Sequence, residues 1–114
     1  MFGPSIKKIG KWAQKGNIAK LEKVISGDNV EFRNAAFKAL GESGNQECIN
    51  LLTSYVRHPD AEIRRLSAQA MGDSGAERTI EFLRKLANDD DSEDVREAAK
   101  KSILQINEIL AQAE

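Results

Sequence analysis

The sequence is poor in the residues that mark several large protein classes. Its one cysteine, Cys48, excludes an internal disulfide framework. Two prolines, two threonines and 5% aromatic residues give little material for the period-two apolar pattern of a sheet protein. No apolar run approaches the roughly 18 residues of a membrane-spanning helix, so we expect no integral membrane segment. Abundant helix formers then favour an all-α domain, and 114 residues leave room for one.

An excess of charge is also missing. Seventeen basic residues face eighteen acidic ones, and the net charge of −1 argues against strong nucleic-acid binding by the whole chain. Residues 1–14 lack the apolar stretch of a secretory signal, and position 2 is Phe2 rather than the glycine that myristoylation requires. With a single thiol as well, we expect the protein in the reducing cytoplasm.

A repeated block organises the chain. Residues 29–33, 60–64 and 92–96 each read as a helix-capping residue, any residue, an acid, a bulky apolar residue and an arginine. The arginines Arg33, Arg64 and Arg96 lie 31 and then 32 residues apart, and residues 30–56 align with 61–87 without a gap. A fixed period of this length is typical of stacked helical units.

Local signals divide each unit into two helices. Asn29, Asp60 and Ser92 are side chains that cap a helix start, and Gly41 and Gly44, like Gly72 and Gly75, are expected to end helices. The pattern predicts helices over residues 4–15, 17–26, 29–41, 45–57, 60–73, 76–88 and 92–112.

The stretch Asp60-x-Glu62-Ile63-Arg64, followed by Ala68, Ala70 and Met71-Gly72, resembles the HEAT-repeat family in the short form related to phycobilisome-lyase-type repeats. The resemblance covers residues 17–107. It implies a right-handed α-solenoid of three helix pairs, 17–41, 45–73 and 76–112, behind a capping helix at 4–15. It also implies that the repeated arginines, namely Arg33, Arg64 and Arg96, form a ladder with aspartates between repeats.

The same resemblance places the second helix of each pair on the concave face, where repeat arrays usually bind. The polar side of these helices is a candidate protein-binding surface, although a solvated face has the same pattern. Phe37 lies at its edge, either as a contact residue or, as we favour, packed against the helix of its own repeat. We call this set the concave strip: Asn34, Phe37, Lys38, Arg65, Gln69, Glu97 and Lys101.

Residues for catalysis or metal binding are not assembled in the sequence. His58 is the one histidine and precedes Pro59 in a turn, so neither a histidine pair nor a His-Glu step exists. Cys48 lies near a helix start without a histidine partner, which favours a structural thiol. The acidic run at 89–91 lacks the glycine and terminal glutamate of an EF-hand loop. We therefore expect no enzyme activity, no metal and no cofactor.

The near-zero net charge conceals two oppositely charged ends. Residues 1–25 hold six lysines and one acid, whereas residues 89–114 hold eight acids and three bases. In the first helix Lys7, Lys11 and Lys15 form one stripe, and Ile6, Ile9 and Ala13 form another, with Trp12 at its border. This helix is either a cap over the first repeat, which we favour, or a binding surface for an anionic membrane, for RNA or for an acidic partner.

The leading hypothesis is a non-catalytic scaffold or adaptor that binds another protein through the concave strip. Two alternatives remain open at this point. One is an accessory subunit of a phycobilin-lyase-type enzyme, which the resemblance alone suggests. The other is peripheral membrane or nucleic-acid binding through the lysine-rich first helix. Capped ends predict a monomer or a weak dimer.

Overall fold

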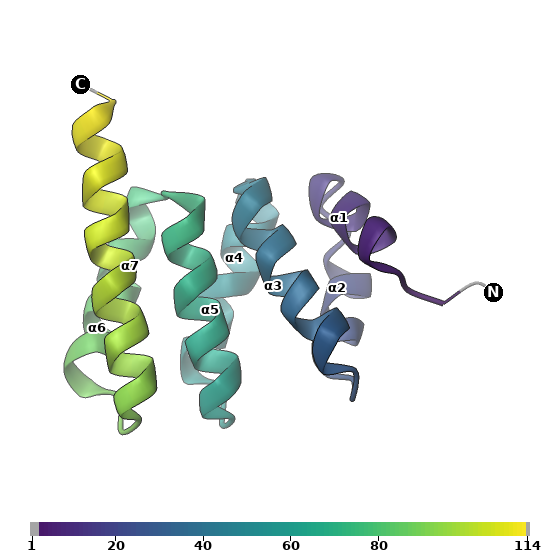
Figure 1. Ribbon diagram of the computed structural model, residues 1–114, viewed down its shortest axis with the longest axis horizontal. Coiled ribbons are helices and arrows are strands. Elements are labelled where there is room, and N and C mark those ends of the chain that lie inside the picture. Colours follow the sequence, from purple (N-terminus) through teal and green to yellow (C-terminus); the bar gives the residue numbers. More distant parts are fainter. Residues whose placement is uncertain (1–2, 114) are drawn as a thin grey trace.

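The computed structural model describes residues 3–113 and consists of helices joined by short turns, with no strand in that range (Figure 1). It measures 43 × 35 × 18 Å along its principal axes. The predicted all-α class is therefore confirmed. The helices are α1 (Ile6–Gln14), α2 (Ile18–Ile25), α3 (Val30–Ser43), α4 (Gln46–Ser54), α5 (Ala61–Ser74), α6 (Ile80–Asp89) and α7 (Glu93–Gln112), with 3-10 turns η1 (Tyr55–Arg57) and η2 (Glu77–Thr79).

The helices lie in two layers. One layer is the row α1, α3, α5 and α7, in which each helix packs on the next. The other contains α2, α4 and α6, and each of these packs against the helix that follows it in the chain. Figure 1 shows α3, α5 and α7 side by side in front of the fainter α4. This is the predicted stack of helix pairs, with α1 as an additional helix at one end.

Side-chain caps start the helices of the first layer. The Asn29 Oδ1 atom accepts a hydrogen bond from the Phe32 N–H (2.9 Å), and the Asp60 Oδ1 atom accepts one from the Glu62 N–H (2.9 Å). Ser92 caps α7 in the same way. Each bond satisfies a backbone donor that has no partner inside the helix, so the three predicted caps are confirmed.

Glycines have two different roles, of which the sequence showed one. Gly44 and Gly75 end α3 and α5 with φ of 61° and 65°, a left-handed conformation that a side chain disfavours. Gly41 and Gly72 were expected to end helices as well, and that prediction is wrong because both lie inside them. A Cβ atom on Gly41 would lie 2.8 Å from the Ala70 carbonyl oxygen of the neighbouring helix. Gly41 therefore permits the close approach of α3 and α5.

The first helix is fastened to the stack by its buried stripe and its carboxyl end. Ile9 and Ala13 are buried against the layer. The Ala13 carbonyl oxygen accepts hydrogen bonds from Asn45 Nδ2 (2.9 Å) and from the Cys48 thiol (3.4 Å), which lie at the start of α4. Burial raises the pKa of the Cys48 thiol, as expected for a structural rather than a reactive cysteine.

The repeated arginines mainly fasten turns within their own repeats. Arg33 donates to the carbonyl oxygens of Ile25 (3.0 Å) and Gly27 (2.6 Å), and Arg96 donates to that of Asp90 (2.7 Å). Arg64 does the same with His58 and, in addition, reaches Asp90 of the next repeat. The expected ladder of arginine–aspartate pairs between repeats is therefore wrong in extent. Within residues 3–113, Arg64 is the one repeated arginine that pairs with an aspartate of the next repeat.

The turn sequences explain that correction. Before α5, Asp60 is itself the capping residue, and the position two residues before it is His58 rather than an acid. Before α7, Ser92 provides the cap, and Asp90 remains available to Arg64. The interval from Arg64 to Arg96 is one residue longer than the preceding interval, which gives room for both functions.

Candidate functional site

The concave strip follows the exposed sides of three helices that lie next to each other. Its members on α3 are Asn34 and Lys38, those on α5 are Arg65 and Gln69, and those on α7 include Lys101. All of these side chains are exposed except that of Arg65, which is 28% exposed. The repeat thus brings residues from 34 to 101 onto one face of the layer.

Two hollows run along this face. The first, of about 380 Å³, lies between α3 and α5, and the second, of about 680 Å³, lies between α5 and α7. They share Arg65 and Gln69, so the two hollows adjoin along α5. The first is lined by Asn34, Phe37, Lys38, Arg65, Leu66, Gln69, Ala70 and Asp73, and the second by Arg65, Gln69, Asp94, Glu97, Ala98, Lys100, Lys101 and Leu104.

Phe37 lies below this surface rather than on it. Its side chain is 2% exposed, and its ring meets the ring of Tyr55 edge to face at 5.7 Å between centroids. The favoured reading of Phe37 as a packing residue is therefore the correct one, and one of its packing partners, Tyr55, comes from the η1 segment of the next repeat. Phe37 forms part of the floor of the first hollow and offers no exposed ring for binding.

Residues that the sequence reasoning left out of the strip also line it. Asp73 and Asp94 add acidic groups, and Lys100 adds a second lysine beside Lys101. Leu104 adds an apolar side chain that is 64% exposed. A signal for Leu104 existed: it lies eight residues after its repeat arginine, the place that Gly41 and Gly72 occupy in the other repeats.

Hydrogen bonds hold several charges of the strip in place. Arg65 donates to both carboxylate oxygens of Glu62 at 2.8 and 2.7 Å, and this bonding lowers the pKa of Glu62 below its ordinary value. The Gln105 amide donates to Asp73 at 3.1 Å across α5 and α7. Lys38 and Lys101, by contrast, form no ion pair within residues 3–113. The strip therefore carries fixed polar groups at its centre and free amines toward both ends.

His58 is remote from the strip: its Nδ1 atom accepts from the Asp60 N–H at 3.0 Å, and its ring lies edge to face with Tyr55. Burial, with the nearby Glu22 carboxylate, raises the pKa of Tyr55 to about 12. Over the described part of the chain, no group of three histidine, cysteine or acidic residues is placed to hold a metal ion.

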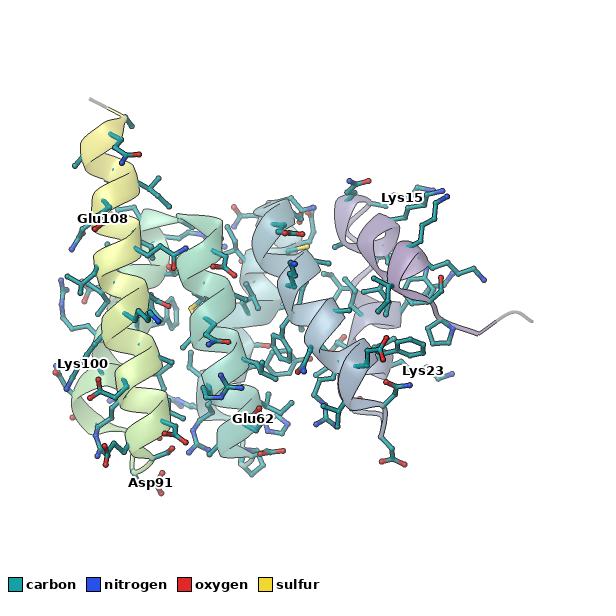
Figure 2. All side chains as sticks on the ribbon, viewed as in Figure 1. Lys15, Lys23, Glu62, Asp91, Lys100 and Glu108 are labelled. Atoms are coloured by element: carbon teal, nitrogen blue, oxygen red, sulfur yellow. The ribbon has the colours of Figure 1, made fainter. Side chains whose placement is uncertain are left out.

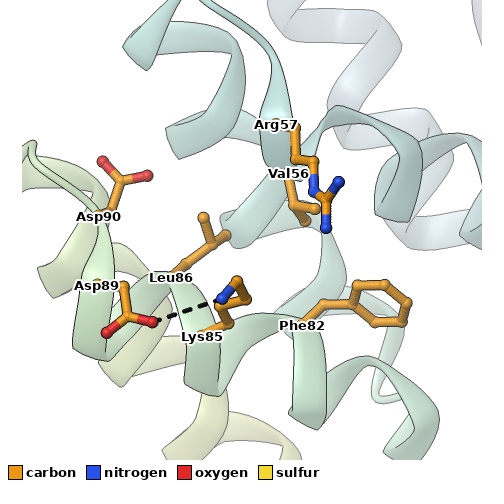
Figure 3. A pocket seen from close by; sticks show the side chains of 7 residues that line it. All are labelled: Val56, Arg57, Phe82, Lys85, Leu86, Asp89 and Asp90. Atoms are coloured by element: carbon orange, nitrogen blue, oxygen red, sulfur yellow. Dashed lines mark ion pairs between the residues drawn. The ribbon is translucent and has the colours of Figure 1, made fainter.

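A smaller hollow of about 170 Å³ lies in the other layer, between η1 and α6 (Figure 3). Val56, Phe82 and Leu86 supply its apolar walls. The Lys85 amine and the Asp89 carboxylate, 3.6 Å apart, form an ion pair beside it. The hollow has room for about one apolar side chain, which makes it less suited than the strip to recognising an extended partner.

A family model described as HEAT repeats matches residues 18–103, which is most of the chain and includes α2 to α6 and the first half of α7. The phycobilisome-lyase-type subfamily has no separate support. No curated protein matches the chain. None of the helices in residues 3–113 is both long enough and apolar enough to span a membrane.

Proposed function

Since the chain belongs to the HEAT-repeat family, whose members commonly serve as non-catalytic scaffolds for protein interactions, we propose that it is an adaptor that binds another protein along the concave strip. The partner lies across α3, α5 and α7. Arg65 contacts the middle of the bound segment. Further polar contacts come from Asn34, Lys38, Gln69, Glu97 and Lys101.

The adjacency of the two hollows supports this proposal most directly. Because the hollows share Arg65 and Gln69, one extended segment can occupy both without leaving the surface. The pairing of Arg65 with Glu62 holds the guanidinium in place before binding. Less side-chain conformational entropy of Arg65 is therefore lost when a partner binds. Leu104 at the far end offers an apolar surface in the hollow that Lys101, which forms no ion pair within residues 3–113, also lines.

The two other candidate functions have less support. An accessory role beside a phycobilin-type lyase rests on the subfamily resemblance alone, and no feature of residues 3–113 adds support for it. Membrane binding by the first helix requires a continuous apolar face free for lipid, whereas Ile9 and Ala13 of α1 are buried in the stack and only Ile6 of that stripe is exposed, at 48%. The favoured reading of α1 as a cap agrees with this burial.

Affinity capture from cell extract with matched variants tests the adaptor role. The double substitution Glu62→Arg with Arg65→Glu keeps an ion pair on α5 but reverses its direction, and Lys38→Glu removes a free amine from the strip. Arg84→Glu and Lys85→Glu, on the other layer, are the controls. We expect partners captured by the wild type to be lost with the strip variants and kept with the controls. Capture that is equal for every variant contradicts the proposal.

A further inference from the structure

Six lysines gather at the amino-terminal end of the chain and form no ion pair within residues 3–113. Every ion pair within residues 3–113 joins residues between 62 and 100. The lysines of α1 and α2 are exposed and have no such partner, and Figure 2 shows Lys15 and Lys23 projecting at this end of the stack. This group consists of Lys7, Lys8, Lys11, Lys15, Lys20 and Lys23. An unneutralised cluster of this kind attracts a partner of opposite charge.

An aromatic hollow of about 460 Å³ lies among these lysines, and it is separate from the concave strip. Trp12 of α1 and Phe32 of α3 are both half-buried in its wall. The Lys20 amine lies 5.3 Å from the centre of the Trp12 ring, so the cation is held over the aromatic face. The remaining lining residues are Gly3, Pro4, Lys23, Val24, Gly27, Asp28 and Asn29.

The shape of this end distinguishes a protein partner from a lipid surface. A helix that lies in a membrane interface inserts a continuous apolar face, but in the apolar stripe of α1 only Ile6 is exposed, at 48%, whereas Ile9 is 0% and Ala13 is 1% exposed. Ile6 and Val30 are exposed singly outside the hollow, whereas the two aromatic side chains, Trp12 and Phe32, line a recess rather than a protruding face. A recess accepts a side chain that projects from a partner.

We propose that the amino-terminal end of the stack binds an acidic protein segment that carries one large apolar side chain. The apolar side chain enters the hollow and packs on Trp12 and Phe32, while neighbouring carboxylates bind Lys20 and Lys23. Asp28, which also lines the hollow, repels carboxylates of the partner on its own side of the hollow. This repulsion sets the orientation in which the acidic segment binds. This site functions independently of the concave strip and would let the adaptor hold two partners.

Trp12 makes the proposal directly measurable, because it is the one tryptophan of the sequence and lines the hollow. The full chain is titrated with a short synthetic peptide of glutamates around a central leucine, and with the same peptide carrying alanine instead. We expect a saturable change in Trp12 fluorescence, with affinity about tenfold weaker for the alanine peptide because most of the apolar burial is lost. Added salt weakens both titrations.

Charge-matched variants locate the site. Lys23→Glu and Lys85→Glu alter the net charge equally, but Lys23 lines the hollow and Lys85 lies on α6. We expect Lys23→Glu to lower the affinity for the leucine peptide about tenfold or more, and Lys85→Glu to leave that affinity nearly unchanged. The proposal is overturned by an absence of saturation, by equal affinity for the two peptides, or by equal effects of the two variants. Sedimentation of the protein with vesicles of phosphatidylcholine and phosphatidylserine would overturn it in favour of a lipid surface.

Discussion

The Arg64 guanidinium and the Asp90 carboxylate join the second repeat to the third through two hydrogen bonds, at 2.8 Å from Nε and 3.2 Å from Nη2. The two side chains are 12% and 6% exposed, so the pair is shielded from solvent. Arg64 also donates to the His58 carbonyl oxygen at 2.7 Å. One arginine therefore fastens the turn before α5 and the turn before α7 at the same time.

Replacing Asp90 tests how much this pair contributes. Asp90→Asn leaves a shielded guanidinium without its charged partner, and we expect a loss of about 1 to 3 kcal/mol in the free energy of unfolding. Asp91→Asn is the matched control, since Asp91 also reaches Arg64 but is 93% exposed. We expect no measurable change in the free energy of unfolding for Asp91→Asn. Urea denaturation followed by circular dichroism compares the two variants, and equal stability losses would contradict a special role for Asp90.

The pair of Arg64 and Asp90 predicts that the free energy of unfolding depends on pH. Burial of the Asp90 carboxyl acts to raise its pKa, but hydrogen bonds from Arg64 and from the Ser92 N–H outweigh burial and leave the pKa below its ordinary 3.8. The stabilisation is therefore fully present above that value and is lost as the pH falls through the lowered pKa of the folded state. The stability difference between wild type and Asp90→Asn should be constant from pH 7 to about pH 5 and shrink below about pH 4. A difference that grows on acidification would contradict the assignment.

Glycine substitutions separate packing from helix propensity. Gly41→Ala puts a Cβ atom 2.8 Å from the backbone oxygen of Ala70, so α3 and α5 must separate, and we expect a loss of about 1 to 3 kcal/mol in unfolding free energy. Gly10→Ala in α1 meets nothing within 4 Å and should stabilise the protein by about 0.5 to 1 kcal/mol. Thermal denaturation measures both, and a neutral or stabilising Gly41→Ala would show that the close approach is unnecessary.

Periodicity and capping chemistry were sufficient to predict most of the architecture. Asn29, Asp60 and Ser92 cap helices as expected, because a cap depends on neighbours within a few residues of the chain. Gly41 was misassigned because its role depends on how near another helix lies, and the local sequence does not contain that distance.

The site shows the same division between local and distant information. The exposed positions of the strip follow from helical spacing, but Phe37 is buried and contacts Tyr55, which comes from the next repeat. The arginine ladder was predicted from resemblance, whereas Arg33 binds the carbonyl oxygens of Ile25 and Gly27. Such partners are backbone atoms of a turn, and no residue type in the sequence identifies them.

Site-specific photo-crosslinking tests the central claim, that a protein partner lies along the concave strip, most directly. A photoreactive amino acid replaces Gln69, which is exposed and shared by both hollows, and in a second variant it replaces Arg84 on α6. The adaptor account predicts that irradiated cells yield a discrete covalent protein adduct at position 69 and none at position 84. Adducts at position 84 alone, or none at position 69, would contradict it.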